Sequence, residues 1–271
     1  LYVDNQDLSL DAHGDFKAID SDGNTVSLGW QHTGENDWTV GLGFSSGRIK
    51  SDGYDGLWSS KMRINQLGLS LKRRYGAFKL AGIFTYGWSD TETKRKGTLL
   101  EPFTTEAERY MDVTSLALRS QYDFELGTWF LRPKFDIGLM HLRARGATEL
   151  GLGQAGLVLN DYSENHAWIR PAFEVGKEFE PRSDLRLRFI LELAAQQYLE
   201  DSTNVEARFR GLPGTLDPMV LSSELDDPRV DGSIGFDLIG ENDMVLQLYY
   251  QRSWADQRDR DSISLKFQMP L

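Results

Sequence analysis

DSISLKFQMPL, residues 261–271, closes the chain and decides the fold. Its apolar side chains occupy every second position: Ile263, Leu265, Phe267, Met269 and Leu271. The positions between them are polar: Ser262, Ser264, Lys266 and Gln268. Because strand side chains alternate between two faces, the stretch predicts a strand with one apolar and one polar face. A terminal strand leaves an unpaired edge unless it pairs with the first strand and closes a barrel.

Composition narrows the fold class further. The 271 residues include 26 glycines, 14 phenylalanines and 10 tyrosines, which are typical of short strands and turns. No stretch approaches the roughly 18 uninterrupted apolar residues of a membrane helix, so any membrane span has to be a strand. A barrel of this length commonly forms one domain, here residues 1–271. The chain opens on Leu1-Tyr2-Val3-Asp4 without a signal peptide, so we expect it to be one domain of a longer protein.

Several kinds of site are not expected. The absence of cysteine excludes disulfides and thiolate metal sites. A net charge of -11, without a basic cluster interleaved with aromatics, argues against nucleic acid. The four histidines (His13, His32, His141 and His166) lack ligand spacing, so we predict no metal and no other cofactor. Residues 43–47 match G-x-S-x-G but continue an alternating strand instead of turning into a helix, so we predict no enzyme.

Alternating stretches recur along the whole chain and predict twelve antiparallel strands. Their cores are residues 7–12, 25–30, 38–44, 67–71, 78–88, 116–124, 129–139, 167–179, 185–194, 234–238, 246–250 and 261–271. Connections are short after even-numbered strands and long after odd-numbered ones. An outer-membrane barrel has an even number of strands, short periplasmic turns and long extracellular loops, whereas a soluble sandwich has no reason to sort its loops. We therefore predict an all-β, transmembrane, antiparallel up-and-down β-barrel.

Residues 185–194 fix the two faces, because five apolar side chains alternate with Arg186, Arg188, Ile190, Glu192 and Ala194. We predict that the apolar rows face lipid, including the C-terminal row of Ile263, Leu265, Phe267, Met269 and Leu271. The polar rows should line the pore: Asp7, Asp11, Lys79, Arg119, Asp123, Arg132, Lys134, Asp136, Arg170, Glu174, Arg186, Arg188, Glu192, Asp237 and Lys266. Together with Glu178 and Asp231 they comprise nine acids and eight bases, a balance that suits pairing across strands in a lumen. A soluble barrel would reverse the two faces.

Aromatic residues gather at both ends of the predicted strands. Those beside the short turns are Trp30, Trp38, Tyr75, Phe78, Phe124, Trp129 and Phe179. Those near the opposite rim are Phe44, Trp88, Tyr198 and Trp254. Two such groups are typical of membrane-interface girdles, although strands are enriched in aromatics generally. Pro133 and Pro171 fall inside strands and cannot donate to the ladder, so we expect bulges or bends there.

Three stretches carry a resemblance to a known family. They are Trp38-Thr-Val-Gly-Leu-Gly-Phe-Ser-Ser-Gly47, Arg74-Tyr-Gly-Ala-Phe-Lys-Leu-Ala-Gly-Ile-Phe-Thr-Tyr-Gly-Trp88 and Trp129-Phe-Leu-Arg-Pro133. With the strand spacing and loop order, they make the chain resemble the C-terminal translocator domain of autotransporters, the type V secretion proteins of Gram-negative bacteria. It departs from the resemblance at Leu271, because family members usually end in Phe or Trp.

The resemblance implies a function and partners. The barrel would lie in the bacterial outer membrane, where it would anchor an N-terminal passenger and export it to the cell surface. Its partners would be outer-membrane lipid and lipopolysaccharide, its own passenger and linker in the lumen, and the barrel-assembly machinery, and it would be a monomer. A stand-alone channel, an outer-membrane hydrolase and a soluble β protein remain as alternatives.

Overall fold

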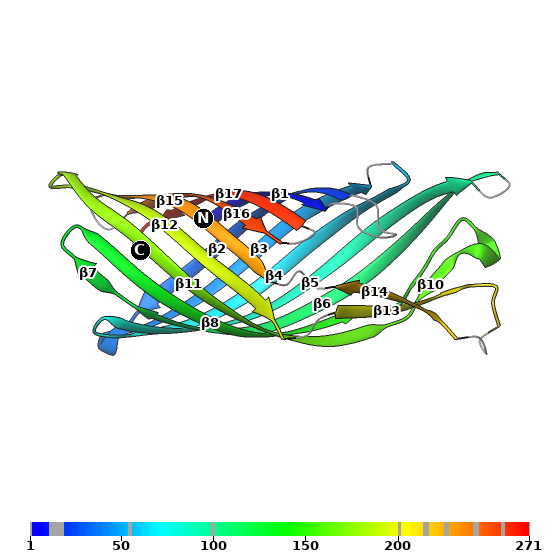
Figure 1. Cartoon of the computed structure of the whole chain (residues 1–271), viewed down its shortest axis with the longest axis horizontal. Coiled ribbons are helices and arrows are strands. Elements are labelled where there is room, and N and C mark those ends of the chain that lie inside the picture. Colours follow the sequence, from blue (N-terminus) through cyan, green and yellow to red (C-terminus); the bar gives the residue numbers. More distant parts are fainter. Residues whose placement is uncertain are drawn as a thin grey trace.

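The computed structural model describes residues 2–10, 19–53, 56–98, 101–199, 202–213, 217–224, 228–240, 244–255 and 258–270. In these residues, twelve antiparallel strands close into a barrel, as predicted (Figure 1). The strands are β1 (Tyr2–Leu10), β2 (Ile19–Thr33), β3 (Trp38–Gly53), β4 (Trp58–Tyr75), β5 (Phe78–Thr98), β6 (Pro102–Tyr122), β8 (Trp129–Ala144), β11 (Tyr162–Arg182), β12 (Leu185–Tyr198), β15 (Arg229–Ile239), β16 (Val245–Trp254) and β17 (Arg258–Gln268). Each strand pairs with the next along the chain.

The last strand closes the barrel against the first. β17 pairs with β1 from Tyr2↔Lys266 to Leu10↔Arg258, and β1 pairs with β2 on its other side. The sequence prediction that the C-terminal stretch closes the barrel is therefore confirmed for residues 261–268, where β17 ends. Leu271 lies outside the described residues.

Tight turns join the strands at one end of the barrel. Gly76 and Gly127 adopt positive φ angles of 59° and 68°, which a two-residue hairpin turn requires and glycine permits at little cost. The β2–β3 connection is the short 3₁₀ segment η1 (Glu35–Asp37), whose Asn36 and Asp37 also have positive φ. These short connections match the predicted periplasmic turns.

At the other end the strands are longer than the sequence predicted. Residues 50–60 and 90–109 were expected to be loops, yet β5 and β6 stay paired up to Thr98↔Pro102. Both faces of this hairpin carry polar residues, for example Lys94, which donates a hydrogen bond to Glu106. Hydrophobic periodicity therefore disappears although the strand continues, and a pattern based on one apolar face cannot detect it.

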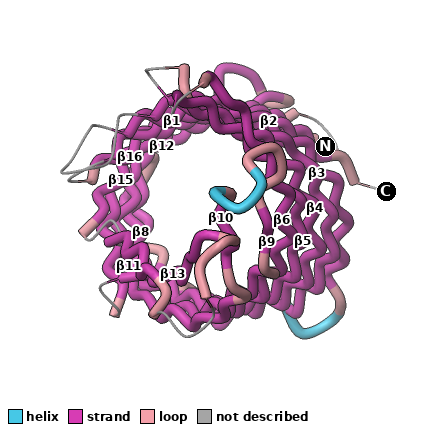
Figure 2. Tube along the Cα trace, turned by 90° about the vertical axis from the view of Figure 1, so that its right-hand side faces the viewer, coloured by secondary structure: helices cyan, strands magenta, loops and turns pink. Residues whose placement is uncertain are grey.

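The two longest connections also contain regular structure, contrary to the prediction of irregular loops. They supply β9 (Ala147–Thr148), η2 (Gly153–Ala155), β10 (Leu157–Leu159), β13 (Ser202–Phe209) and β14 (Met219–Glu224). These strands form a second sheet in the order β14-β13-β10-β9. In the view along the barrel, η2 and its flanking segments project inside the ring of strands (Figure 2). The mouth on this side is therefore partly covered.

Neither proline forms a bulge in the described strands, so that part of the expectation is wrong, whereas the local bend stays a prediction. The β11–β12 register is the same at Ile169↔Gln197 and at Ala172↔Ala194, on either side of Pro171. Around Pro133 the partner strand breaks at Asp123 and resumes as β7 (Phe124–Leu126), again without a shift of register. Each missing N–H donor interrupts the hydrogen bonding locally, and the hydrogen bonds on either side of the proline keep the register of the strand unchanged.

Apolar side chains cover the outer surface. Leu28, Leu42, Leu69, Leu116 and Leu193 are among the exposed ones. On β17, Ile263, Leu265 and Phe267 are exposed as well, and so is Met269 just after the strand. Tyr198 is an exception to the predicted outer aromatic groups: it pairs in register with Trp168 and contacts the buried ring of His166 edge-on, on the inner side. Contact of the outer rows with lipid stays a prediction.

Glycine and aromatic residues face each other across the inner wall. The pairs Gly138↔Trp168, Phe130↔Gly176 and Gly235↔Tyr249 are each directly opposite on neighbouring strands. In each pair a Cβ on the glycine would overlap the aromatic ring. The rings therefore lie flat across the glycines and cover backbone that a side chain would otherwise shield.

Gly138→Ala is expected to lower the free energy of unfolding by about 1–3 kcal/mol, because the new methyl group overlaps the Trp168 indole. Gly68→Ala is the matched control, since the nearest atom to its Cβ is Thr85 Cγ2 at 3.9 Å. Urea unfolding in lipid vesicles measures both variants. Equal losses at the two glycines would show that the ring contact is not responsible.

Candidate functional site

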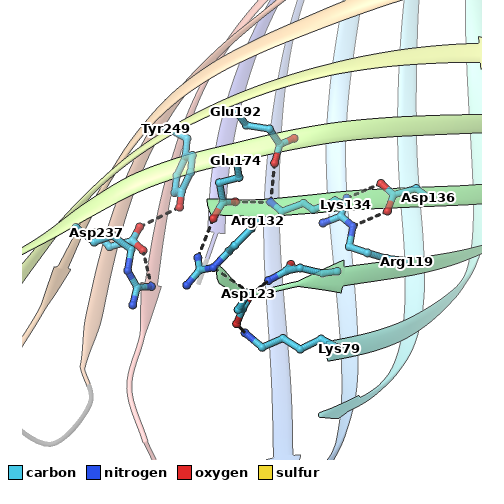
Figure 3. A network of polar contacts seen from close by, with 12 residues as sticks. Lys79, Arg119, Asp123, Arg132, Lys134, Asp136, Glu174, Glu192, Asp237 and Tyr249 are labelled. Carbon is cyan, nitrogen blue, oxygen red and sulfur yellow. Dashed lines mark hydrogen bonds and ion pairs between the residues drawn. The ribbon is translucent and has the colours of Figure 1, made fainter. Parts of the chain in front are cut away.

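The buried charged residues of the barrel lie on its inner wall, where many of them form one network (Figure 3). Buried carboxylates include Asp123, Asp136, Glu174, Asp231 and Asp237, whereas the large apolar side chains of the same strands are exposed on the outside. The alternation along each strand places the two sets on opposite faces. The candidate functional site is therefore the lumen.

Lys134 lies at the centre of this wall. Its side chain is 7% exposed, and its Nζ donates a hydrogen bond to Glu174 and another to Glu192, the latter at 2.6 Å. Glu174 also accepts a hydrogen bond from Arg132 at 2.7 Å. Lys134, Glu174 and Glu192 come from β8, β11 and β12, so the ammonium group of Lys134 joins three neighbouring strands.

Arg170 extends the network on one side. It donates a hydrogen bond to Glu192 at 2.8 Å and lies 3.3 Å from Asp231 and 3.5 Å from Asp136. Asp136 in turn forms a bidentate pair with Arg119, with both N···O distances at 2.7 Å. Bidentate arginine pairs fix the relative orientation of both groups as well as their charge.

Asp123 extends the network on the other side. It lies 2.5 Å from Lys79 and 3.2 Å from Arg132. The connected network then contains six cations and five carboxylates: Lys79, Arg119, Arg132, Lys134, Arg170 and Arg229 with Asp123, Asp136, Glu174, Glu192 and Asp231. Each charge has an opposite partner, so the wall is close to neutral.

A smaller cluster lies nearer the short turns. Arg188 pairs with Glu178 at 2.5 Å and with Asp237 at 3.5 Å. Asp237 also accepts hydrogen bonds from Tyr249 at 3.0 Å and from Gln247 at 2.9 Å. β11, β12, β15 and β16 are joined on the inner side in this way.

The remaining predicted pore residues differ in their placement. Lys266 follows the polar row of β17, in register with Gln247. Arg186 lies in the same inner row as Arg188 and is exposed near the turn. Asp11 lies outside the described residues.

The predicted place of Asp7 in the pore stays a prediction. Asp7 is in register with Asp261, in the row that alternates with Asp4 and Gln6, and its side chain lies outside the described part of the chain. Asp4 is the buried acid of that strand, with one oxygen accepting a hydrogen bond from Gln6. The sequence pattern began this strand at residue 7, whereas β1 begins at Tyr2.

The opposite wall of the lumen is lined by small residues. Gly29, Gly43 and Gly68 are directly opposite one another on β2, β3 and β4. Ser27↔Ser45 is one neighbouring pair of this inner row. The lumen thus has one charged wall of long paired side chains and one smooth wall of glycine and serine.

At the covered mouth, one ion pair holds the β9–β10 loop to the β5–β6 hairpin. Arg95 donates two hydrogen bonds to Glu149, at 2.9 and 2.5 Å, and the N–H of Leu157 donates a third at 3.0 Å. Burial by itself would raise the pKa of Glu149, but these donors outweigh it and hold the pKa below its usual range. A depressed carboxylate pKa contributes stability above the unfolded-state pKa of about 4.3, which is lost as the pH falls through the folded-state pKa.

Glu149→Gln is therefore expected to speed amide hydrogen exchange in residues 147–159 at neutral pH, because a neutral amide cannot replace the charged pair. In the unsubstituted chain the same increase should appear only below about pH 4. Glu125→Gln, at the short-turn end, is the control and should leave this loop unchanged. Protection that is identical in both variants at neutral pH would contradict the assigned contact.

Two features of other membrane proteins and metalloproteins are absent from the described residues. No helix within the described ranges is long and apolar enough to cross a membrane. The described residues also contain no group of three or more His, Asp or Glu side chains that could hold a metal ion. Residues 43–47 continue the strand β3, as predicted, and form no strand-to-helix turn.

One family model matches most of the chain. The family model "Autotransporter beta-domain" matches residues 2–251. Among solved structures, the translocator domain of NalP from Neisseria meningitidis has a TM-score of 0.74 at 15% identity, covering 97% of this chain and 84% of that one. The β-domain of Bordetella BrkA has a TM-score of 0.68 at 14% identity (99% and 98% covered). The transport unit of AIDA-I from Escherichia coli has 0.63 at 10% identity (99% and 89%). A search of curated proteins found no match.

Proposed function

The chain belongs to the autotransporter β-domain family, and from that premise we propose that it is an outer-membrane translocator which anchors a passenger domain and exports it through its lumen. The observation that carries this proposal is the lumen itself, a closed barrel with a neutralised charged wall facing a smooth wall of small residues. A polypeptide in transit then meets few unpaired charges, so no single segment would be held tightly.

Finer properties follow from the same fold. We propose a monomer, because the twelve described strands of the barrel wall close on themselves and leave no free edge in that wall for pairing with a second copy. We propose that lipid and lipopolysaccharide surround the apolar outer rows, and that the barrel-assembly machinery inserts the domain. We also propose that the domain has no catalytic activity, since the lumen carboxylates are engaged with cations.

Surface display of a reporter passenger tests the export function. A reporter fused ahead of the chain should reach the cell surface, as measured by antibody binding to intact cells. Tryptophan at all three of Gly29, Gly43 and Gly68 should narrow the lumen from its smooth wall and reduce display by at least tenfold. Tryptophan at the outward neighbours Leu28, Leu42 and Leu69 is the matched control.

The outcomes separate export from a stand-alone channel. Both variants must first show heat-modifiable gel migration, which establishes that the barrel is folded. Normal display by the folded glycine variant would contradict passage through the lumen. A reporter that stays in the periplasm with the unsubstituted barrel would favour the channel.

A further inference from the structure

Four cations form a compact group on the outer surface. Arg48 and Lys50 of β3 lie directly opposite Arg63 and Lys61 of β4, all four side chains are exposed, and we call them the basic patch. They follow the outward row of Leu42 and Phe44 along β3, so they share its face. None of the pore-lining contacts involves them.

Within the basic patch, like charges face each other across the two strands. Like charges directly opposite on neighbouring strands destabilise a sheet, and the patch contains two such pairs in succession. Arg63 is compensated by Asp90 at 2.7 Å. Arg48, Lys50 and Lys61 form no hydrogen bond or ion pair with any residue that the structure describes. Three cations therefore remain available to an anion from outside.

The height of the basic patch is set by its strands. Trp38↔Arg73 marks the turn-side end of the outer face, where the Arg73 guanidinium lies 4.9 Å from the Trp38 ring. Arg48↔Arg63 is ten residues further along both strands, which is roughly 25 Å at a strand tilt of about 40°. This equals the height of the apolar band of a membrane barrel.

The rows in between support the same boundary. Phe44↔Leu67 is exposed and apolar, and the next outward row is Ser46, which donates a hydrogen bond to Asn65 at 2.9 Å. The basic patch follows immediately. The sequence of rows is thus apolar, hydrogen-bonded polar, then cationic, on the side of the long connections.

We propose that the basic patch binds the phosphorylated headgroup of an outer-leaflet lipid, whose acyl chains lie against the row of Phe44 and Leu67. Clustered Lys and Arg at the level of the headgroups are the recognised means of attracting anionic lipid. Asp22 opposite Lys50 and Glu92 opposite Lys61 limit the site to the two strands β3 and β4. The inference rests on the proposed placement of the barrel in the outer membrane.

Lipid retention measured by native mass spectrometry tests the site. The chain is folded into nanodiscs of zwitterionic phosphatidylcholine that contain a small fraction of bisphosphorylated lipid A, and the lipid A retained by the barrel is counted. Arg48→Gln with Lys50→Gln should reduce retention roughly 30-fold, since each cation near a membrane surface contributes about fivefold. For lipid A without its phosphates, the unsubstituted chain and the variant should show the same retention, because the cations then have no phosphate to bind.

Two controls make the result specific. Arg143→Gln removes a single exposed arginine of β8 that lies opposite Asp112, and it should leave retention unchanged. Inorganic pyrophosphate at the concentration of the lipid should not displace lipid A, because the apolar row contributes only to the lipid. Equal retention of phosphorylated and dephosphorylated lipid, an equal loss in Arg143→Gln, or displacement by pyrophosphate would each overturn the proposal.

The assay contains no passenger, so its failure is distinguishable from a failure of export. Heat-modifiable migration confirms folding of every variant before lipid is counted. Loss of surface display with intact lipid retention would count against the translocator function alone.

Discussion

Replacing Lys134 with methionine is expected to lower the free energy of unfolding by about 3 kcal/mol, the lower end of the range for breaking a buried ion pair. The change leaves Glu174 and Glu192 facing each other without the ammonium group between them. The loss stays at the lower end because Arg132 and Arg170 each remain paired with one carboxylate. Urea unfolding in lipid vesicles measures it.

Arg186→Met is the matched control for this prediction. Arg186 lies in an inner row but is exposed, and it forms no ion pair with the residues that the structure describes, so its loss should cost under about 1 kcal/mol. Adding Glu192→Gln to Lys134→Met should recover part of the stability, because it removes one uncompensated charge. A loss at Lys134 no larger than at Arg186 would show that the network is well hydrated and contributes little.

Arginine at Leu191 is expected to cost about 2–4 kcal/mol, because a charge then faces the middle of the apolar band. Leu191 is exposed on the outer face of β12, in register with Val175 and Ile234. Leu185→Arg places the same charge on the same strand beside the turn, where the cost should fall to about 1 kcal/mol or less. Vesicle refolding measures both.

The comparison between these two leucines tests which face of the barrel meets lipid. If arginine at Leu191 and at Leu185 were equally tolerated, the outer rows would be in water and the membrane placement would be wrong. A difference that depends on depth is not expected for a soluble barrel, whose outer surface is uniformly hydrated.

The transmembrane part of the fold could be predicted because one physical rule acts on every strand there. Leu185, Leu187 and Phe189 alternate with charged neighbours. Such alternation shows where each strand lies, which of its faces is apolar, and in which order the strands follow along the chain. The pairing of the last strand with the first could be predicted because the backbone N–H and C=O groups of an edge strand need hydrogen-bond partners. Arg119 with Asp136 could be expected on facing strands, although the sequence alone did not provide the register.

The parts that could not be predicted lie where that rule stops. Beyond the apolar band, neither face of a strand has to be apolar. The sequence therefore shows no hydrophobic periodicity in the halves of β5 and β6 away from the short turns, or in the sheet of β9, β10, β13 and β14. The ion-pair network also depends on the register between strands far apart in sequence, as for Arg170 and Asp231. Arg229 joins this network through Asp231, and Tyr249 joins the smaller cluster through Asp237; only the fold brings these residues together.

The unequal strands give the barrel an oblique outlet. β5 and β6 each contain 21 residues, whereas β16 and β17 have 10 and 11. A polypeptide that leaves the lumen therefore passes long strands on the β5–β6 side of the mouth and short strands on the β16–β17 side. In the described residues, the first free segment of such a polypeptide would have a taller wall beside it on the β5–β6 flank than on the β16–β17 flank.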